Sequence, residues 1–218
     1  MPTISKSAET NWTIDALAVR DLAVDRGGRR VFEGLSLDVP AGAGVAVTGP
    51  NGSGKSTLLR ALAGLLKPTE GSVAFAGADP EAPMASHVHY VGHLDAVKTQ
   101  ESVQQNMAFW ATWLGTPLDL DGIEAALEPL DLAHLVDLPA SVLSAGQKRR
   151  LSLSRLLAAP RPVWLLDEPT GALDAASERR FCAMIERHLD AGGLVVAATH
   201  LPLDVDRLAP FAIAEAAP

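Results

Sequence analysis

The sequence predicts an α/β fold, in which helices cover both faces of a mostly parallel sheet. Two observations predict it: short apolar segments alternate with segments of helical periodicity, and one apolar segment runs straight into a glycine-rich loop. Strands joined by short connections come first in the chain, which predicts an antiparallel β appendage beside the main sheet. With 218 residues, of which 48% are hydrophobic, the chain can bury a core without disulfides.

The first half of the chain is rich in strands. Residues 1–13 are polar and predict a flexible tail. Gly27 and Gly28 predict a turn between two segments in which apolar and polar residues alternate. From these patterns we expect strands at 14–24, 31–39, 44–48, 72–75 and 88–91, and a helix at 58–66.

The second half is rich in helices. Apolar residues recur at helical spacing, with interruptions at Gly115 and Pro117, and Pro160 ends another helical segment. Two short and wholly apolar segments have the length of buried strands. We expect helices at 102–114, at 123–130, from about 146 to just before Pro160 and at 175–189, and strands at 163–166 and 194–198.

The charge and composition exclude several classes of protein. Eighteen basic and 26 acidic residues give a net charge of −8, which argues against binding nucleic acid through overall charge. The single cysteine, Cys182, cannot form an intramolecular disulfide and is expected to be a small buried hydrophobe. No apolar segment approaches the ~20 residues that span a bilayer, and no secretion signal opens the chain. We therefore expect a soluble chain, which would need another polypeptide to cross a membrane.

A phosphate-binding motif follows the third expected strand. The pattern G-x-x-x-x-G-K-[ST] is matched in full by Gly49, Pro50, Asn51, Gly52, Ser53, Gly54, Lys55 and Ser56, and Thr57 follows. In such a loop, main-chain N–H groups and a helix N-terminus bind phosphate oxygens. We expect Lys55 to reach the β and γ phosphates and the Ser56 hydroxyl to ligate Mg²⁺. The alternative is a glycine-rich turn with a chance Lys-Ser pair, but the strand before it and the helix after it favour phosphate binding.

Two carboxylates end the expected strand at 163–166. On a strand next to the phosphate loop, Asp167 would lie near a bound Mg²⁺. Glu168 is placed to polarise a water molecule in line with the γ phosphate. The alternative is an ordinary strand that runs into an acidic turn, and the preceding phosphate loop disfavours it.

Residues 143–150, with the sequence LSAGQKRR, closely resemble the LSGGQ signature of ATP-binding-cassette (ABC) ATPases. In that family the signature lies at a helix N-terminus and binds the γ phosphate of the nucleotide held by the opposite subunit. The resemblance therefore implies nucleotide contacts from Ser144, Ala145, Gly146 and Gln147, although alanine replaces the commoner glycine at position 145. The alternative is an ordinary helix start at Ser144.

Two further segments extend the resemblance. Residues 171–174 resemble the D-loop of the family, so Asp174 is expected to cross a dimer interface. Thr199 and His200 resemble the switch segment, whose histidine contacts the γ phosphate. The motifs occur in the family's order over nearly the whole chain. The resemblance implies one P-loop NTPase (RecA-like) ABC ATPase domain over 14–218, with an antiparallel β lobe and a helical lobe at about 94–143.

One departure from the family narrows the resemblance. ABC ATPases usually place a glutamine after the strand that corresponds to 88–91, and His93 stands there in this chain. This histidine, the LSAGQKRR form and the short chain after His200 are similar to the ATP-binding subunits of cytochrome c maturation (heme-export) systems. We expect His93 to lie by Mg²⁺ and the attacking water, and to link the site to a membrane partner.

The resemblance implies a set of ligands and partners. The ligands are ATP and Mg²⁺, and the catalytic residues are Glu168, His200 and Lys55. The partners are a second copy of the chain, closed head to tail around two ATP molecules, and a transmembrane subunit at the cytoplasmic face of the inner membrane. Neither nucleic acid nor direct heme binding is expected. The alternatives are an ABC transporter ATPase for another substrate and a soluble nucleic-acid or ribosome-remodelling ABC protein, which usually has tandem cassettes or basic extensions.

Several residues keep two interpretations. Arg26 occupies a slot in which ABC ATPases often stack the adenine on an aromatic ring, so it either stacks on the base or is a solvated hairpin arginine. The three histidines within 87–93 suggest a metal or heme, but no cysteine or carboxylate completes a ligand set. Trp110 and Trp113, at helical spacing, belong either to the core of the helical lobe or to a contact with a membrane partner.

Overall fold

The computed structural model describes residues 14–79 and 81–213, so the tail expected at 1–13 lies outside the described residues. The strands are β1 (Ala16–Arg26), β2 (Arg29–Pro40), β3 (Gly44–Thr48), β4 (Glu70–Ala76), β5 (Val88–Val91), β6 (Val163–Asp167), β7 (Leu194–Ala198) and β8 (Leu208–Ala212). The α-helices are α1 (Lys55–Leu62), α2 (Val103–Trp113), α3 (Leu120–Leu127), α4 (Ala145–Ala158) and α5 (Ala175–Asp190). Short 3₁₀ helices are η1 (Met84–Ser86), η2 (Glu128–Leu130), η3 (Ala133–Leu135) and η4 (Ala140–Val142).

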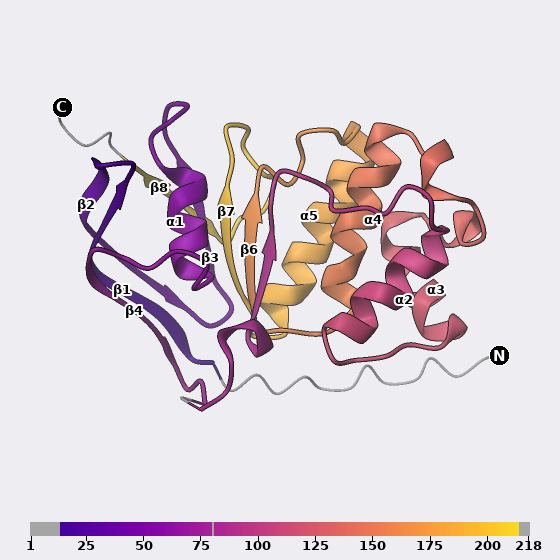
Figure 1. Cartoon of the computed structure of the whole chain (residues 1–218), viewed down its shortest axis with the longest axis horizontal. Helices are drawn as coiled ribbons and strands as arrows, with labels where there is room; N and C mark the ends of the chain where they lie inside the picture. The colour runs from indigo at the N-terminus through magenta and orange to yellow at the C-terminus, as the bar shows by residue number, and fades with distance from the viewer. Residues whose placement is uncertain (1–13, 80, 214–218) are drawn as a thin grey trace.

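The strands form two sheets, as the sequence predicts. The antiparallel sheet has the order β2-β1-β4, and the parallel sheet has the order β5-β6-β7-β3-β8. Helix α1 lies between the two sheets, α4 and α5 cover the other face of the parallel sheet, and α2 and α3 lie farther out (Figure 1). The predicted α/β class and the antiparallel appendage are both confirmed.

The parallel sheet separates two hydrophobic cores. On β6, Val163 and Leu165 pack with α1 and the antiparallel sheet, whereas Trp164 and Leu166 pack with the helices on the opposite face. This alternation is what a strand buried on both faces requires. Cys182 is 5% exposed and belongs to the helical-side core, which confirms its interpretation as a small buried hydrophobe.

Helix α1 differs from the predicted helix at both ends. It spans Lys55–Leu62, whereas the periodicity predicts 58–66. The helix begins inside the phosphate-binding motif, where the polar residues Lys55 and Ser56 give no apolar period to detect. It ends early because Gly64 adopts φ +70° and the N–H groups of residues 64–66 turn back to carbonyls of the last turn.

The other helices are close to prediction because their capping residues are evident in the sequence. Ser102 and Ser144 form capping boxes at the starts of α2 and α4, and Asp174 caps α5. Helix α3 starts three residues before the predicted 123, because the Asp119 side chain accepts a hydrogen bond from the N–H of Gly122 and caps the helix there. Within the described residues, no helix combines the length and apolar character that a membrane span requires.

Strand β8 is absent from the sequence-based prediction. It pairs in parallel with β3 along the edge of the sheet, with Pro210 opposite Ala46. Proline has no N–H for a sheet ladder and is tolerated in a strand chiefly at a sheet edge, which is where it lies here. The pairing with β3, rather than any local pattern, makes this segment a strand.

Candidate nucleotide-binding site

Most of the sequence-predicted site residues, apart from the signature residues and Asp174, converge because four parallel strands end at one edge of the sheet. The phosphate loop follows β3, His93 follows β5, Asp167 ends β6, and His200 follows β7. Ligands of open α/β sheets bind outside the carboxyl ends of the strands. The segments that follow these four strands therefore form a single cluster in space.

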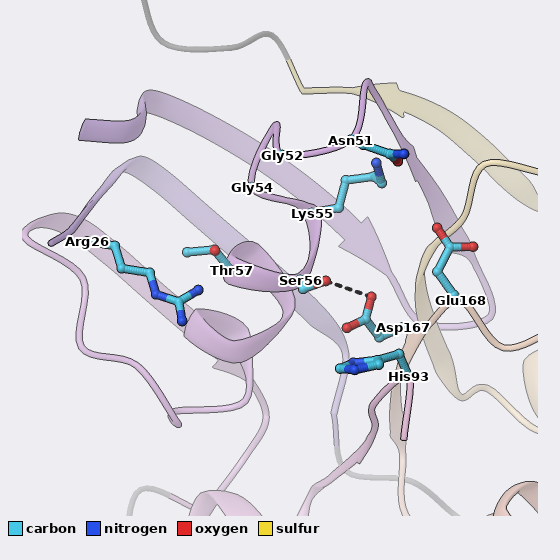
Figure 2. A pocket seen from close by; sticks show the side chains of 10 residues that line it. All are labelled: Arg26, Asn51, Gly52, Gly54, Lys55, Ser56, Thr57, His93, Asp167 and Glu168. Atoms are coloured by element: carbon cyan, nitrogen blue, oxygen red, sulfur yellow. Dashed lines mark hydrogen bonds between the residues drawn. The ribbon is translucent and has the colours of Figure 1, made fainter. Parts of the chain in front are cut away.

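A pocket of about 400 Å³ opens at this edge. Figure 2 shows Arg26 and Thr57 toward one end and Glu168 at the other, with the phosphate loop along the rim. The lining residues are Arg26, Asn51, Gly52, Gly54, Lys55, Ser56, Thr57, His93, Asp167 and Glu168. Three residues of the motif, Gly49, Pro50 and Ser53, belong to the loop but do not line the pocket.

The backbone of the loop depends on Gly54. This residue is the N-cap of α1 with φ +97°, a conformation that side chains strongly disfavour. A Cβ there would lie 2.6 Å from Val31 Cγ1 and 3.0 Å from Phe32 Cδ1. The antiparallel sheet therefore packs so closely on the loop that only glycine fits, and the first N–H groups of α1 are directed at the pocket.

Lys55 lies across the loop. It is 8% exposed, and its Nζ donates to the carbonyls of Gly49 at 2.8 Å and Pro50 at 3.0 Å. Ser53 is 1% exposed and turns inward against Gly49, so it supports the loop from beneath. The ammonium group at the pocket wall is the cation that phosphate oxygens require.

Ser56 and Asp167 face each other across the floor of the pocket. The Ser56 hydroxyl donates to Asp167 Oδ1 at 2.9 Å, and Asp167 is 1% exposed (Figure 2). The other oxygen, Oδ2, accepts a 3.4 Å hydrogen bond from Tyr90, whose own hydroxyl accepts from Arg60 Nε at 3.4 Å. A hydroxyl and a carboxylate so placed fit Mg²⁺, which binds one or two protein oxygens together with phosphate and water.

Glu168 and His200 form a hydrogen-bonded pair beside the phosphate loop. His200 Nδ1 donates to Glu168 Oε2 at 2.7 Å, and the Glu168 side chain is 29% exposed. Glu168 has φ +47°, a left-handed conformation that costs a non-glycine residue roughly 1–2 kcal/mol. Backbone strain of this kind persists only where the surroundings fix it, and it is typical of catalytic turns.

The signature residues lie elsewhere on the chain. Ser144 caps α4, where its hydroxyl accepts from the Gln147 N–H at 3.2 Å while the Gln147 side chain accepts from the Ser144 N–H at 2.8 Å. Ala145 is exposed and Gly146 is half-buried. Asp174 is exposed and caps α5, and the Ser177 N–H holds the pKa of that carboxyl below its ordinary value. The structure does not bring these residues into the chain's own pocket.

Sequence reasoning missed two residues at the site. Tyr90, the only tyrosine of the chain, approaches Asp167 from β5. Arg149 is 3% exposed and donates hydrogen bonds to the carbonyls of Asp167 and Glu168. The sequence contained one signal for Arg149, because a charged residue on a helix that packs against the sheet must find buried partners.

The structure distinguishes between the two interpretations of the histidines and of the tryptophans. The three histidines do not converge: His89 is buried and donates to the Ala159 carbonyl at 2.6 Å, whereas His93 lies in the pocket. Trp113 is 73% exposed and stacks on Phe109, so of its two interpretations the core one is wrong. Trp110 is half-buried, with Arg155 over its ring. Helix α2 buries Met107 and leaves Trp113 exposed.

Comparisons with known proteins agree with this geometry. The ABC transporter family model matches residues 32–171. The cytochrome c biogenesis ATP-binding export protein CcmA of Rhodopseudomonas palustris (strain BisB5) is 50% identical over 190 residues, which cover 87% of this chain and 94% of that protein. CcmA of Paramagnetospirillum magneticum (strain ATCC 700264 / AMB-1) is 48% identical over 212 residues, with coverage of 92% and 97%.

A solved structure gives the same result. A putative ABC transporter ATP-binding protein from Pyrococcus furiosus superposes with a TM-score of 0.78 at 25% identity, covering 91% of this chain and 97% of that one. The fold, the order of the motifs and the close relatives agree. The chain belongs to the CcmA family of ABC transporter ATP-binding proteins.

Proposed function

We propose that the chain is the ATP-hydrolysing subunit of a membrane complex that acts in heme export or delivery for cytochrome c maturation. One observation carries the ATPase assignment: a phosphate loop, a Ser56–Asp167 pair and a Glu168–His200 pair line or adjoin one pocket. The biological role rests on relatives at about half identity, which are named as ATP-binding export proteins of cytochrome c biogenesis.

The pocket holds a nucleotide through its phosphates. The loop N–H groups, the N-terminus of α1 and Lys55 bind the β and γ phosphates, while Thr57 and Arg26 line the end where the base would lie. Ser56 and Asp167 hold Mg²⁺, which neutralises charge on the phosphate oxygens when bound. The whole segment 14–218 acts as one ATP-binding unit, with a helical lobe at about 94–143.

Hydrolysis begins with Glu168 as general base. Its carboxylate accepts a proton from a water molecule whose oxygen attacks the γ phosphorus, and the bond to the β-phosphate oxygen breaks to leave ADP and phosphate. His200 orients the carboxylate through the 2.7 Å hydrogen bond and contacts the γ phosphate. His93 lines the same pocket and positions the water from the other side.

A second copy of the chain completes the site. Ser144, Gly146 and Gln147 are solvent-accessible at a helix N-terminus, where free N–H groups favour a phosphate, yet they lie outside the chain's own pocket. A head-to-tail dimer brings them, with Ala145 and Asp174, onto the nucleotide of the other copy. Two ATP molecules are then buried between two chains.

A transmembrane subunit docks on the helical side, at the cytoplasmic face of the inner membrane. Leu94, Phe109 and Trp113 are exposed at 71%, 37% and 73%, and Leu94 directly follows His93. Phe109 and Trp113 stack on each other on α2, and large exposed apolar side chains that gather in this way are typical of protein contacts. The position of Leu94 next to His93 supports a docking surface that is linked to the pocket through His93.

The test is a strain that lacks the chain. Covalently bound heme in c-type cytochromes is measured by heme staining after complementation with the wild-type chain or with Glu168→Gln. We expect wild-type protein to restore cytochrome c heme and the variant to fail, while the wild-type chain co-purifies with a transmembrane protein. Normal cytochrome c heme in the deleted strain would favour a transporter for another substrate. Co-purification with ribosomes or nucleic acid instead would favour the soluble class.

A further inference from the structure

Arg149 is a buried cation whose partners are mostly main-chain carbonyls. It lies five residues after Ser144 on α4 and is 3% exposed. In the turn that follows β6, its Nε donates to Pro169 O at 2.9 Å, and its Nη2 donates to Asp167 O at 3.1 Å and Glu168 O at 2.7 Å. The guanidinium therefore fixes the main chain of three consecutive residues that include the general base.

The same guanidinium also contacts the segment after β5. Its Nη1 donates to Gly92 O at 3.0 Å and to Asp95 Oδ1 at 3.3 Å. Gly92 directly precedes His93, which lines the pocket. A guanidinium has five N–H donors in a rigid plane, and the five hydrogen bonds of Arg149 engage all of them. The two segments are therefore held at a fixed separation.

The hydrogen bond to Glu168 explains how a strained residue keeps its conformation. The Glu168 N–H donates to Ala198 O on β7 at 2.9 Å, while its carbonyl accepts from Arg149 at 2.7 Å. Both peptide groups are thus held while φ is +47°. The direction of the carboxylate toward the pocket depends on both contacts.

We propose that Arg149 is a positioning residue that couples the two nucleotide sites of a dimer. The inference rests on the proposed function, in which the N-terminus of α4 binds the nucleotide of the second copy. Arg149 is on the same helix and is bonded to the Glu168 turn and to the His93 segment of its own pocket. Engagement of the signature on one nucleotide therefore sets the general base for the other.

The test compares Arg149→Gln with Arg161→Gln in the full-length chain. Arg161 is a matched control because it is 6% exposed and donates to a main-chain carbonyl, that of Leu114 at 3.0 Å, away from the pocket. Thermal unfolding is measured first, and kinetics are measured below both transitions. We expect Arg149→Gln to lower kcat about 10- to 100-fold at unchanged ATP affinity and to bring the Hill coefficient for Mg·ATP toward 1. The control should keep wild-type values of both, and an equal loss in the two variants would overturn the proposal.

Two more variants separate coupling from simple structural support. Lysine keeps the charge but concentrates its donors at one nitrogen, so Arg149→Lys should be as slow as Arg149→Gln. Full activity of Arg149→Lys would show that only the charge is needed. It would refute the proposal that the donors of Arg149 hold the Glu168 turn and the His93 segment together.

A double-variant cycle combines Arg149→Gln with Ser144→Ala. If the two residues act through one coupling, kcat of the double variant should be no lower than that of the slower single variant. If the two reductions in kcat multiply, the residues act independently and the coupling is refuted. If Ser144→Ala alone leaves turnover unchanged, the result contradicts the composite site of the proposed function, and not only the coupling through Arg149.

Discussion

At the scale of single residues, the proposed general base is the Glu168 carboxylate, which is held by His200 at 2.7 Å. Glu168→Gln removes the proton acceptor but keeps the shape of the side chain. We expect kcat to fall about 10²–10⁴-fold at unchanged ATP affinity, since general base catalysis contributes roughly that factor. Phosphate release and the ATP dissociation constant measure the two effects. Glu124→Gln, an exposed change on α3, is the control and should hydrolyse ATP at the wild-type rate. Hydrolysis near that rate in Glu168→Gln would show that Glu168 is not the general base.

The end of the pocket near Arg26 is expected to discriminate poorly between bases. Arg26 and Thr57 line this end, and a guanidinium can stack on a purine without reading its edge (Figure 2). GTP should therefore support hydrolysis with kcat/KM within about tenfold of ATP, a difference of ~1.4 kcal/mol. Competition kinetics with both nucleotides measure the ratio. A preference for ATP beyond a hundredfold would mean that another group recognises adenine.

Residue-level prediction from the sequence named residues that line the pocket where their signal is local in the chain. The phosphate loop is one continuous motif, and Asp167 and Glu168 directly follow a recognisable strand. Arg149 could not be placed in this way, because its acceptors Glu168 and Gly92 are 19 and 57 residues away. Only the folded chain shows that one guanidinium contacts both.

At the scale of elements, two buried histidines make the packing around β5, β6 and α5 sensitive to acid. Burial lowers the pKa of His89 to about 3 and that of His188 to about 4, and His188 stacks on Trp164 at 3.8 Å. Both histidines are neutral in the fold and become protonated near pH 6.5 once the chain unfolds. The unfolded state thus binds more protons between about pH 6.5 and 4, and stability is lost as the pH falls through this range.

We therefore predict a steep fall in the free energy of unfolding below neutrality. Two histidines contribute up to ~2.7 kcal/mol per pH unit between the pKa values of the two states. His89→Gln keeps a donor for the Ala159 carbonyl but cannot titrate. The part of the slope of unfolding free energy against pH that comes from these two histidines should therefore be about halved in the variant. Denaturant unfolding at pH 7.5, 6.0 and 5.0 measures both proteins. Parallel stability curves would show that His89 already titrates normally in the fold.

Element prediction failed where tertiary contacts override local pattern. Strand β8 contains Pro210 and forms only because the edge of β3 is free to pair. Helix α1 starts at Lys55, three residues before its first apolar residue, because the loop at Gly54 directs the chain into it. Trp113 has the spacing of a core residue but faces outward, since periodicity identifies one face of a helix and not which partner covers it.

At the scale of the whole molecule, the proposed function assigns one chain two half-sites that do not meet. The pocket with Lys55 and Glu168 lies at the carboxyl edge of the parallel sheet, whereas Ser144 lies at the start of α4 and outside that pocket. Closed two-fold symmetry lets each copy supply what the other lacks. In the proposed dimer the completing residues belong to another molecule, so the resemblance to a family could suggest this arrangement and no pattern of composition or spacing could.

Complementation between inactive variants tests this arrangement directly. Lys55→Ala disables the phosphate loop and Ser144→Arg blocks the signature, so each homodimer should be inactive. In a mixed dimer, one site carries both defects and the other carries neither. Random mixing makes about half of the dimers mixed, with one intact site of two, so activity should return to at most about a quarter of wild type. The coupling proposed for Arg149 lowers this value further, because the intact pocket belongs to the chain whose own signature is blocked. Mixing Lys55→Ala with Glu168→Gln is the control, because these residues share one pocket and every site then stays defective. ATP hydrolysis is measured against mixing ratio, and a first mixture as inactive as the control would mean that each chain completes its own site.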